Sequence, residues 1–266
     1  MTKEALWEKM VREAERAASA EPFLSDRLHS AILSHPSLSH ALASLLGAKL
    51  SEDPSMAAQS LTGLFYEVLK SSDEVMDAVV KDMEGVLERD PACPSYCHCF
   101  LNFKGFQACE AYRIGHSLWE SGRRDAACAL QSRVSEVLGV DIHPAARIGS
   151  RLLLDHATGV VIGETAVVGE NVAILHGVTL GGTGKHGGDR HPKIGNGVLI
   201  GAGATVIGNI RVGDGAKIGT GAVVLADVPA MATAVGIPAR LVGGKEKPAL
   251  LHEHSGHTMD HVAYVL

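Results

Sequence analysis

The sequence predicts an α+β protein in which an α-helical N-terminal half is followed by a parallel β-helix. Before residue 140, apolar residues recur every three or four positions, as they do along one face of a helix. From Ile142 onward, aliphatic residues recur every six positions instead. Composition changes at the same point, since ten of the eleven aromatic residues precede residue 142 and 22 of the thirty glycines lie within 142–247. A core without aromatic rings indicates a narrow, repetitive interior.

The composition is that of an ordinary globular chain. Of its 266 residues, 46% are hydrophobic and 20% are charged, which argues against disorder over most of the length. The net charge of −6 disfavours nucleic-acid binding, which needs a basic face. The first twenty residues lack the apolar core of a signal peptide, and no apolar run is long enough to span a bilayer. We therefore expect a cytoplasmic protein with no nucleic-acid or membrane partner, whose five cysteines are reduced thiols.

The helical domain is expected over residues 1–139. Proline or glycine interrupts the apolar pattern between its segments, and Ser or Asp near each break can cap the next helix. The segments with helical spacing are Ala5–Ala18, Met56–Leu69, Glu74–Leu87, Phe106–Trp119 and Asp125–Leu138. We expect these helices to form a bundle.

The six-residue period predicts a β-helix over residues 140–244. Three short strands joined by tight turns form a coil of about 18 residues, in which every sixth side chain points into a triangular interior. The period slips by two residues between Leu154 and Ile162 and is interrupted between Leu180 and Ile194. The expected inward positions are Ile142, Ile148, Leu154, Ile162, Val168, Ile174, Leu180, Ile194, Ile200, Val206, Val212, Ile218 and Val224. Residues 142–247 carry ten basic and seven acidic residues, so an anionic ligand is expected here.

Hexads of this kind resemble those of the hexapeptide acyltransferases, and the resemblance implies that the parallel β-helix is left-handed. Five stretches are more specific: KDMEGVLERDPA (81–92), KGFQACEAYRIGH (104–116), VDIHPAARIG (140–149), LDHATGVVIGETAVVG (154–169) and LHGVTLGGTGKHGGDRHPKIG (175–195). Together they resemble serine acetyltransferase, from about the middle of the helical part through Gly244. The resemblance implies transfer of acetyl from acetyl-CoA to the hydroxyl of L-serine, as part of cysteine biosynthesis.

His156 is the candidate general base. Because Leu154 is an inward position, Asp155 and His156 are expected at the coil surface, where a neutral imidazole can accept a proton at physiological pH. A serine hydroxyl needs such a base to attack a thioester. Asp141 precedes His156 by less than one coil and can reach its ring. The resemblance makes His156 the base and Asp141 the residue that orients it.

Four residues are candidates for serine binding. The irregular loop 184–192 breaks the hexads, and its Arg190 offers a planar fork that matches a carboxylate. The resemblance assigns Arg190 and His191 to serine, in a site shared with a neighbouring subunit. It also assigns Asp90 and Asp155 to the substrate ammonium, although an Asp before Pro is equally a common turn residue.

The coenzyme A site is expected where small residues leave the backbone accessible. Ala202, Gly203 and Thr220 would let a pantetheine arm lie close to the chain, and Lys217 could meet a phosphate. These positions carry over from the nucleotide groove of the family. Acetyl-CoA is then a co-substrate, and neither a metal nor a resident cofactor is expected.

Different functions remain open on the residues alone. His186 and His191 have the spacing used by zinc carbonic anhydrases built on a β-helix, with His143, His156 or His176 as a third ligand. A hexapeptide acetyltransferase with another acceptor and a non-catalytic scaffold also fit the repeats. The cluster of Cys93, Cys97, His98 and Cys99 lacks the usual zinc spacing, so these cysteines are expected to be small buried hydrophobes.

The resemblance also implies partners. We expect a homotrimer or a dimer of trimers, with L-cysteine as an inhibitor that competes for the serine pocket. In the family, a flexible tail ending in isoleucine enters the active site of O-acetylserine sulfhydrylase. The tail expected here, 245–266, ends in Leu266, which keeps the terminal carboxylate but changes the branching. We therefore expect weak or partner-specific association with that enzyme.

Overall fold

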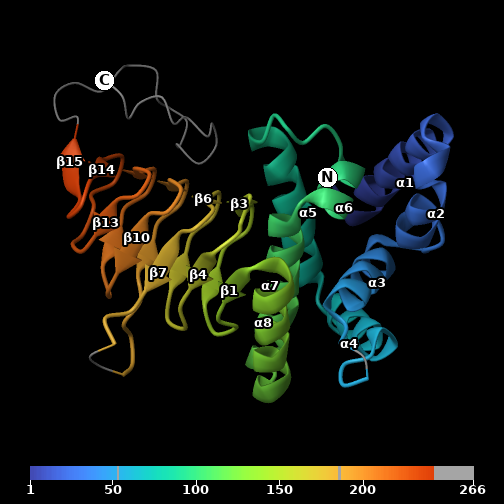
Figure 1. Ribbon diagram of the computed structural model, residues 1–266, viewed down its shortest axis with the longest axis horizontal. Coiled ribbons are helices and arrows are strands. Elements are labelled where there is room, and N and C mark those ends of the chain that lie inside the picture. Colours follow the sequence, from blue (N-terminus) through green and yellow to red (C-terminus); the bar gives the residue numbers. More distant parts are fainter. Residues whose placement is uncertain (53, 185–186, 243–266) are drawn as a thin grey trace.

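A helical part is followed by a β-helix in the computed structural model, which describes residues 1–52, 54–184 and 187–242 (Figure 1). The helices are α1 (Lys3–Ala20), α2 (Ser25–Leu28), α3 (Leu38–Leu50), α4 (Ala58–Ser71), α5 (Asp73–Arg89), α6 (Tyr96–Asn102), α7 (Lys104–Glu120) and α8 (Arg124–Leu138), with a 3₁₀ turn at Pro22–Leu24 and a π-helical turn at His29–Leu33. The predicted α+β architecture is confirmed. The predicted tail lies outside the described residues, and no described helix has the length and apolar character needed to cross a bilayer.

Four of the five segments with helical spacing lie in α1, α5, α7 and α8, and the fifth, Met56–Leu69, begins two residues before α4. The spacing rule does not predict α3, because seven of its thirteen residues are buried and no apolar stripe alternates with a polar face. It also does not predict α6, whose seven residues make only two turns. Helices buried on several sides or shorter than three turns carry little periodic signal.

Fourteen strands of the β-helix form three parallel sheets, and a fifteenth strand pairs antiparallel at the end of one of them. The first sheet contains β1 (Val140–Ile142), β4 (Val160–Ile162), β7 (Thr179–Gly181), β10 (Thr205–Ile207) and β13 (Val223–Val224). The second contains β2 (Arg147–Ile148), β5 (Val167–Val168), β8 (Lys193–Ile194) and β11 (Arg211–Val212). The third contains β3 (Leu153–Asp155), β6 (Ala173–Leu175), β9 (Leu199–Ile200), β12 (Lys217–Ile218), β14 (Thr233–Val235) and β15 (Arg240–Val242).

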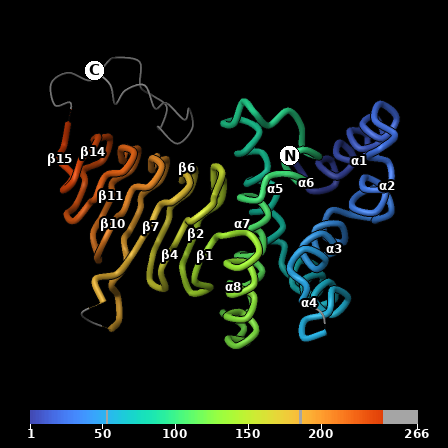
Figure 2. The backbone as a smooth tube through the Cα atoms, viewed as in Figure 1, coloured from blue at the N-terminus to red at the C-terminus, as the bar shows by residue number. Residues whose placement is uncertain are grey.

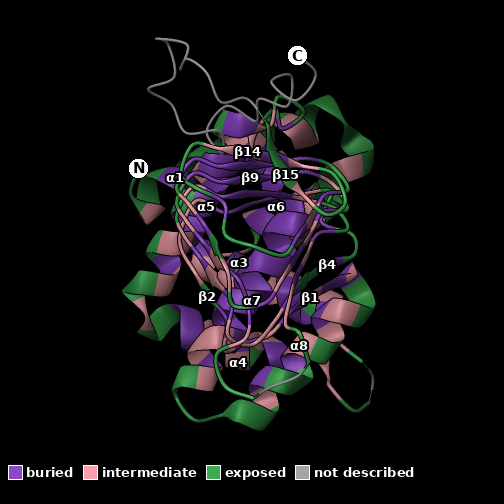
Figure 3. Cartoon of the chain, turned by 90° about the vertical axis from the view of Figure 1, so that its left-hand side faces the viewer, coloured by how far each residue is buried: buried purple, intermediate pink, exposed green. Residues whose placement is uncertain are grey.

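The coils stack along the long axis of the molecule (Figure 2) and enclose a triangular section when viewed end-on (Figure 3). The inward aliphatic positions expected from the hexads are buried, apart from half-buried Ile148. Their side chains fill the prism, which explains why the sequence avoids aromatic rings here. Each strand is only two or three residues long. Backbone hydrogen bonds link the strands of successive coils and continue into the turns between them.

The helical part meets the β-helix at its first coil (Figure 1). Helix α8 ends at Leu138, and Gly139 takes a left-handed conformation (φ 68°) that turns the chain directly into β1. Helix α7 packs on β3 so closely that a Cβ at Gly105 would lie 2.0 Å from the carbonyl oxygen of Leu154. The helical part therefore touches the same strand that leads to His156.

Candidate active site

His156 lies on a corner of the prism that has two extra residues. Strand register gives a coil of 18 residues from Val161 to Thr179 and 26 residues across the inserted loop, from Thr179 to Thr205, but one of 20 residues from Val140 to Val160. Asp155 pairs with Leu175, and the glycine after Thr158 stacks on Gly177, so His156 and Ala157 are the inserted pair. The two-residue slip read from the hexads is this insertion.

The insertion pushes the imidazole out of the prism. His156 and Ala157 both take left-handed backbone conformations (φ 56° and 59°), which are costly for residues other than glycine. The His156 side chain is 76% exposed, and its Nε2 lies 3.8 Å from Oδ1 of Asp155. The Nζ of Lys104, at the start of α7, donates a hydrogen bond to Thr158 and braces this corner.

Asp141 lies on the outward side of β1 and does not contact His156 within the described chain. Its Oδ1 accepts a hydrogen bond of 2.7 Å from Nε2 of Gln131 on α8. Gln131 fixes the carboxylate of Asp141, and nothing in the residue spacing indicates this contact.

The two predicted ammonium anchors have different surroundings. Asp155 ends β3 beside His156, and its side chain is 22% exposed. Asp90 follows α5, and its Oδ1 accepts a hydrogen bond of 2.8 Å from the backbone N–H of Ala92. Asp90 therefore fills the turn role that the sequence also allowed, with a half-buried side chain.

Arg190 and His191 lie on another corner of the prism. The Arg190 guanidinium bonds Oε2 of Glu164 at 2.7 Å, and this hydrogen bond lowers the pKa of Glu164. The hydroxyl of Thr165 accepts the backbone N–H groups of both Arg190 and His191, at 3.0 and 3.1 Å. Glu164 and Thr165 therefore hold the end of the loop. Both belong to the stretch GETAVVG, in which hexad reasoning identified no site residue.

The surroundings of His191 disfavour its charged form and define the tautomer of the neutral ring. Its Nδ1 accepts the N–H of Thr165 at 3.2 Å, so the proton of the neutral ring is on Nε2. The residue is only 7% exposed, and burial next to the Arg190 charge lowers its pKa. A neutral ring with a fixed Nε2–H donor is suited to binding a substrate oxygen.

The two corners are separated by a full side of the prism. The His156 corner joins the third sheet to the first, whereas the Arg190 corner joins the first sheet to the second. One side holds about six residues, or roughly 20 Å at the rise of an extended strand. One chain therefore does not bring His156 together with Arg190 and His191.

The predicted coenzyme A residues follow the His156 corner along the β-helix. Thr158, His176 and Ala202 form one column, because the carbonyl of each accepts the N–H of the glycine one coil further on. Gly203 has a left-handed φ of 66° and no atom within 4 Å of an added Cβ, so the surface is open there. Thr220 is exposed on the next coil, whereas Lys217 is buried.

The zinc hypotheses gain no support from the described residues. His186 lies outside them, and His143, His156, His176 and His191 belong to no described group of three metal-ligand side chains. Cys93, Cys97 and Cys99 are buried free thiols, which confirms the prediction of small buried hydrophobes. Cys97 donates a hydrogen bond from its sulfur to the carbonyl of Met10 at 3.0 Å.

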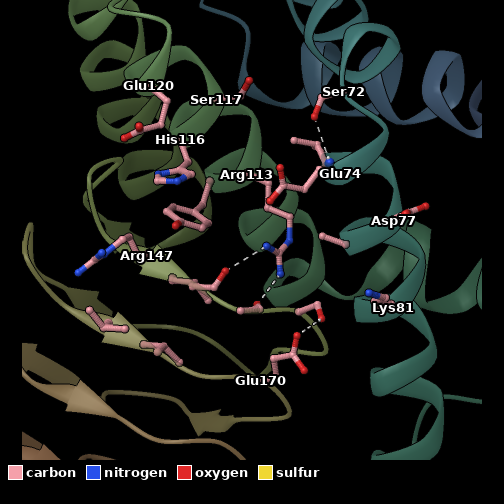
Figure 4. Close-up of a pocket in the computed structure, with 18 residues that line it drawn as sticks. Ser72, Glu74, Asp77, Lys81, Arg113, His116, Ser117, Glu120, Arg147 and Glu170 are labelled. Carbon is pink, nitrogen blue, oxygen red and sulfur yellow. Dashed lines mark hydrogen bonds between the residues drawn. The ribbon is translucent and has the colours of Figure 1, made fainter.

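A cavity of about 970 Å³ lies between α5, α7 and the second sheet (Figure 4). Lys81, His116, Arg147 and Glu170 are among the residues that line it, and none of the predicted site residues does. Its charges are mixed in sign. The cavity is separate from the two corners described above.

Comparison with known proteins identifies the family of both halves. A model described as serine acetyltransferase, N-terminal, matches residues 6–111, and one described as bacterial transferase hexapeptide (six repeats) matches residues 191–226. Serine acetyltransferase 1, chloroplastic, of Arabidopsis thaliana is 57% identical over 260 residues, which cover 98% of this chain and 82% of the relative. Probable serine acetyltransferase 1 of Oryza sativa subsp. japonica is 55% identical, covering 98% and 84%.

Solved structures agree with these matches. Soybean serine acetyltransferase complexed with serine has a TM-score of 0.88 and 57% identity, covering 90% of this chain and 98% of that one. A serine acetyltransferase in complex with cysteine has a TM-score of 0.92 and 45% identity, covering 98% and 99%. Since relatives more than half identical match almost its whole length, the chain belongs to the serine acetyltransferases, a family of hexapeptide-repeat acyltransferases.

Proposed function

We propose that this chain transfers the acetyl group of acetyl-CoA to the hydroxyl of L-serine, with His156 as the general base. The observation that carries the proposal is the two-residue insertion that presents an exposed imidazole on an otherwise regular corner. The serine hydroxyl gives its proton to His156 as its oxygen attacks the thioester carbon. The C–O bond forms, the tetrahedral intermediate collapses with cleavage of the C–S bond, and the thiolate takes the proton back from His156.

Asp141 is proposed to orient the imidazole and to stabilise its protonated form. Gln131 supports this role, because its hydrogen bond holds the carboxylate on the outward face of β1. A carboxylate on one ring nitrogen leaves the other free to accept the substrate proton. No metal or resident cofactor takes part in this scheme, and acetyl-CoA is consumed as a co-substrate.

Serine is proposed to bind between two copies of the chain. Asp155, beside His156, and Asp90 of one copy would receive the ammonium, and the partner corner with Arg190 and His191 would receive the carboxylate. The separation of the two corners within one chain supports this arrangement, because a single copy holds only half of the site. A solved relative complexed with serine supports serine as the acceptor.

The first sheet is the proposed contact between copies. Its outward residues Val161, Thr179, Thr205 and Val223 are uncharged and lie in one row across successive coils, which begins at Asp141 on β1. The second sheet instead presents Arg147, Lys193 and Arg211 in the corresponding row. A sheet whose outward row is uncharged from Val161 onward, and which is flanked by the two half-sites, suits a threefold assembly, and the helical domains can join two trimers.

Coenzyme A is proposed to lie along the column below His156, against Ala202, Gly203 and Thr220, with Lys217 toward a phosphate. The open surface at Gly203 supports this position. L-Cysteine is proposed to compete for the serine site, as a relative with bound cysteine suggests. The tail ending at Leu266 stays a proposed ligand of O-acetylserine sulfhydrylase. Cytoplasmic location also stays a prediction, because relatives carry chloroplastic and mitochondrial names.

The test is turnover of acetyl-CoA by the purified full chain, followed as free CoA thiol, with L-serine, L-homoserine and a sugar as acceptors. We expect turnover with serine above the others, and a loss of several orders of magnitude in kcat for His156→Ala. His35→Ala in the helical part, away from both corners, is the matched control for removal of an imidazole and should keep far more activity. Near-normal turnover by His156→Ala would refute the assignment of the base, and preference for another acceptor would refute the substrate.

A further inference from the structure

A buried charged cluster lies where the helical part meets the first coil of the β-helix. Asp82 of α5 and Glu110 and Arg113 of α7 are 1%, 0% and 8% exposed. The Nε of Arg113 lies 2.6 Å from Oδ2 of Asp82 and 3.8 Å from Oε2 of Glu110. The thiol of Cys109 also faces Oδ2 of Asp82, at 3.7 Å. Two acidic side chains therefore share one arginine away from water.

The cluster also holds the backbone of the β-helix. Oδ1 of Asp82 accepts the N–H of Leu152 at 2.8 Å. Arg113 donates to the carbonyls of Gly149 and Ile148, at 2.9 and 3.4 Å (Figure 4). Leu152 directly precedes β3, whose last residue is next to His156. The cluster thus fixes the chain four residues before the proposed base.

Glu110 is the residue without a hydrogen-bond donor. Neither of its carboxyl oxygens has a hydrogen-bond partner among the described residues, and metal-ligand atoms of Asp82, Cys109 and Glu110 lie within 4.8 Å of one another. Burial, and then the adjacent Asp82 charge, raise the pKa of Glu110 well above its ordinary value. The other titratable groups around it are Cys99 of α6 and Cys109 of α7, whose thiol pKa values burial also raises. A second buried carboxylate beside Asp82 would leave one negative charge uncompensated.

A proton accounts for this geometry better than a metal ion does. Three side chains at this spacing can hold a divalent cation in principle. However, Arg113 already supplies the positive charge, and both oxygens of Asp82 already accept N–H groups from Arg113 and Leu152. A proton on Glu110 lets it donate to Asp82 and makes the set of three neutral overall.

We propose that Glu110 is held as a neutral carboxylic acid that donates to Asp82, and that Asp82, Glu110 and Arg113 are positioning residues for His156. The hydrogen bond from Leu152 to Asp82 fixes the start of β3, and β3 in turn fixes the position of the inserted residues His156 and Ala157. The kinetic part of this inference rests on the proposed role of His156. The protonation of Glu110 does not.

Infrared spectroscopy of the full chain tests the protonation directly. At pH 8, carboxyl groups with ordinary pKa values are ionised, so the difference between wild type and Glu110→Gln should show the carbonyl band of one protonated carboxylic acid. Asp77→Asn, an exposed position on α5, is the matched control and should give no such band. Absence of the band from the Glu110→Gln difference overturns the proposal, as does a stoichiometric metal ion that is lost in Glu110→Gln.

Kinetics test the positioning. Glu110→Gln keeps a donor toward Asp82 and should retain kcat within about threefold, whereas Asp82→Asn should lower kcat at least tenfold, because small displacements of a catalytic group are costly. The acid limb of the pH profile of kcat/KM should also move to lower pH in Asp82→Asn, which a smaller fraction of folded enzyme would not cause. If Asp82→Asn does not fold, Arg113→Lys serves for the same two measurements, because a lysine cannot reach the carbonyls of both Ile148 and Gly149. An unchanged kcat or an unmoved acid limb in Asp82→Asn, or in Arg113→Lys where it replaces that variant, overturns the positioning role.

Discussion

Thr165 is the residue through which the Arg190 corner is most easily perturbed. Its hydroxyl accepts two backbone N–H groups, from Arg190 and His191, and lies 2.9 Å from Nδ1 of His191. Thr165→Val keeps the shape of the side chain but leaves both N–H groups without this acceptor. A net hydrogen bond contributes about 0.5–1.5 kcal/mol, so two such bonds amount to about 2 kcal/mol of the energy that holds the loop in place.

The predicted effect falls on serine rather than on acetyl-CoA. A loss of about 2 kcal/mol corresponds to a 10- to 30-fold fall in kcat/KM for serine, since each factor of ten is about 1.4 kcal/mol. The KM for acetyl-CoA should stay within about twofold, because its proposed groove follows the other corner. Release of CoA thiol at varied serine concentration measures both quantities.

Thr165→Ser is the matched control, because it keeps the hydroxyl and loses only a methyl group. It should retain kcat/KM for serine within about threefold. If Thr165→Val and Thr165→Ser behave alike, the hydroxyl does not hold the loop and the reasoning about this corner is refuted.

Three other predictions concern the junction, the loop and the tail. Gly105→Ala should lower the midpoint of thermal unfolding by several degrees, because the new Cβ would lie 2.0 Å from the carbonyl of Leu154. Gly63→Ala, whose Cβ would have no atom within 4 Å, should raise this midpoint slightly. Equal effects of the two substitutions would contradict the close packing of α7. The pKa of His191 is lowered from its ordinary 6.5, so the folded chain binds fewer protons than the unfolded chain just below that pH and stability should fall on acidification. His191→Gln should lessen this fall in urea unfolding, and an unchanged slope would count against it. A peptide of residues 257–266 should bind O-acetylserine sulfhydrylase more weakly than the same peptide with Leu266→Ile, and no binding by either would mean that the tail lacks this role.

The β-helix could be read from the sequence because every coil repeats the same requirement. An aliphatic side chain must fill the prism at each sixth position, so Ile162, Val168 and Ile174 report the fold independently of one another. The two-residue slip after Leu154 was visible for the same reason, and it marks the corner of His156. Helix α3 carried no such signal, because it is buried on several sides.

The site was only partly predictable because its contacts cross between coils. Thr165 and Glu164 hold Arg190 and His191 from about 26 residues away, and one coil corner looks like another in sequence. Gln131 reaches Asp141 from a helix that the hexads do not describe. The buried cluster of Asp82, Glu110 and Arg113 joins two helices to a backbone amide, a relation that no periodic pattern records.

The most direct test of the account is complementation between two inactive variants. His156→Ala lacks the base, and Arg190→Ala lacks the proposed carboxylate anchor on the other corner. If each site is built from two copies, chains of the two variants co-expressed in equal amounts will form some sites with both residues intact, about a quarter of them for random mixing in a trimer. We predict recovery of roughly that share of wild-type turnover in the mixed oligomer. Activity no higher than that of the separate variants, in oligomers shown to contain both chains, would contradict a site shared between copies.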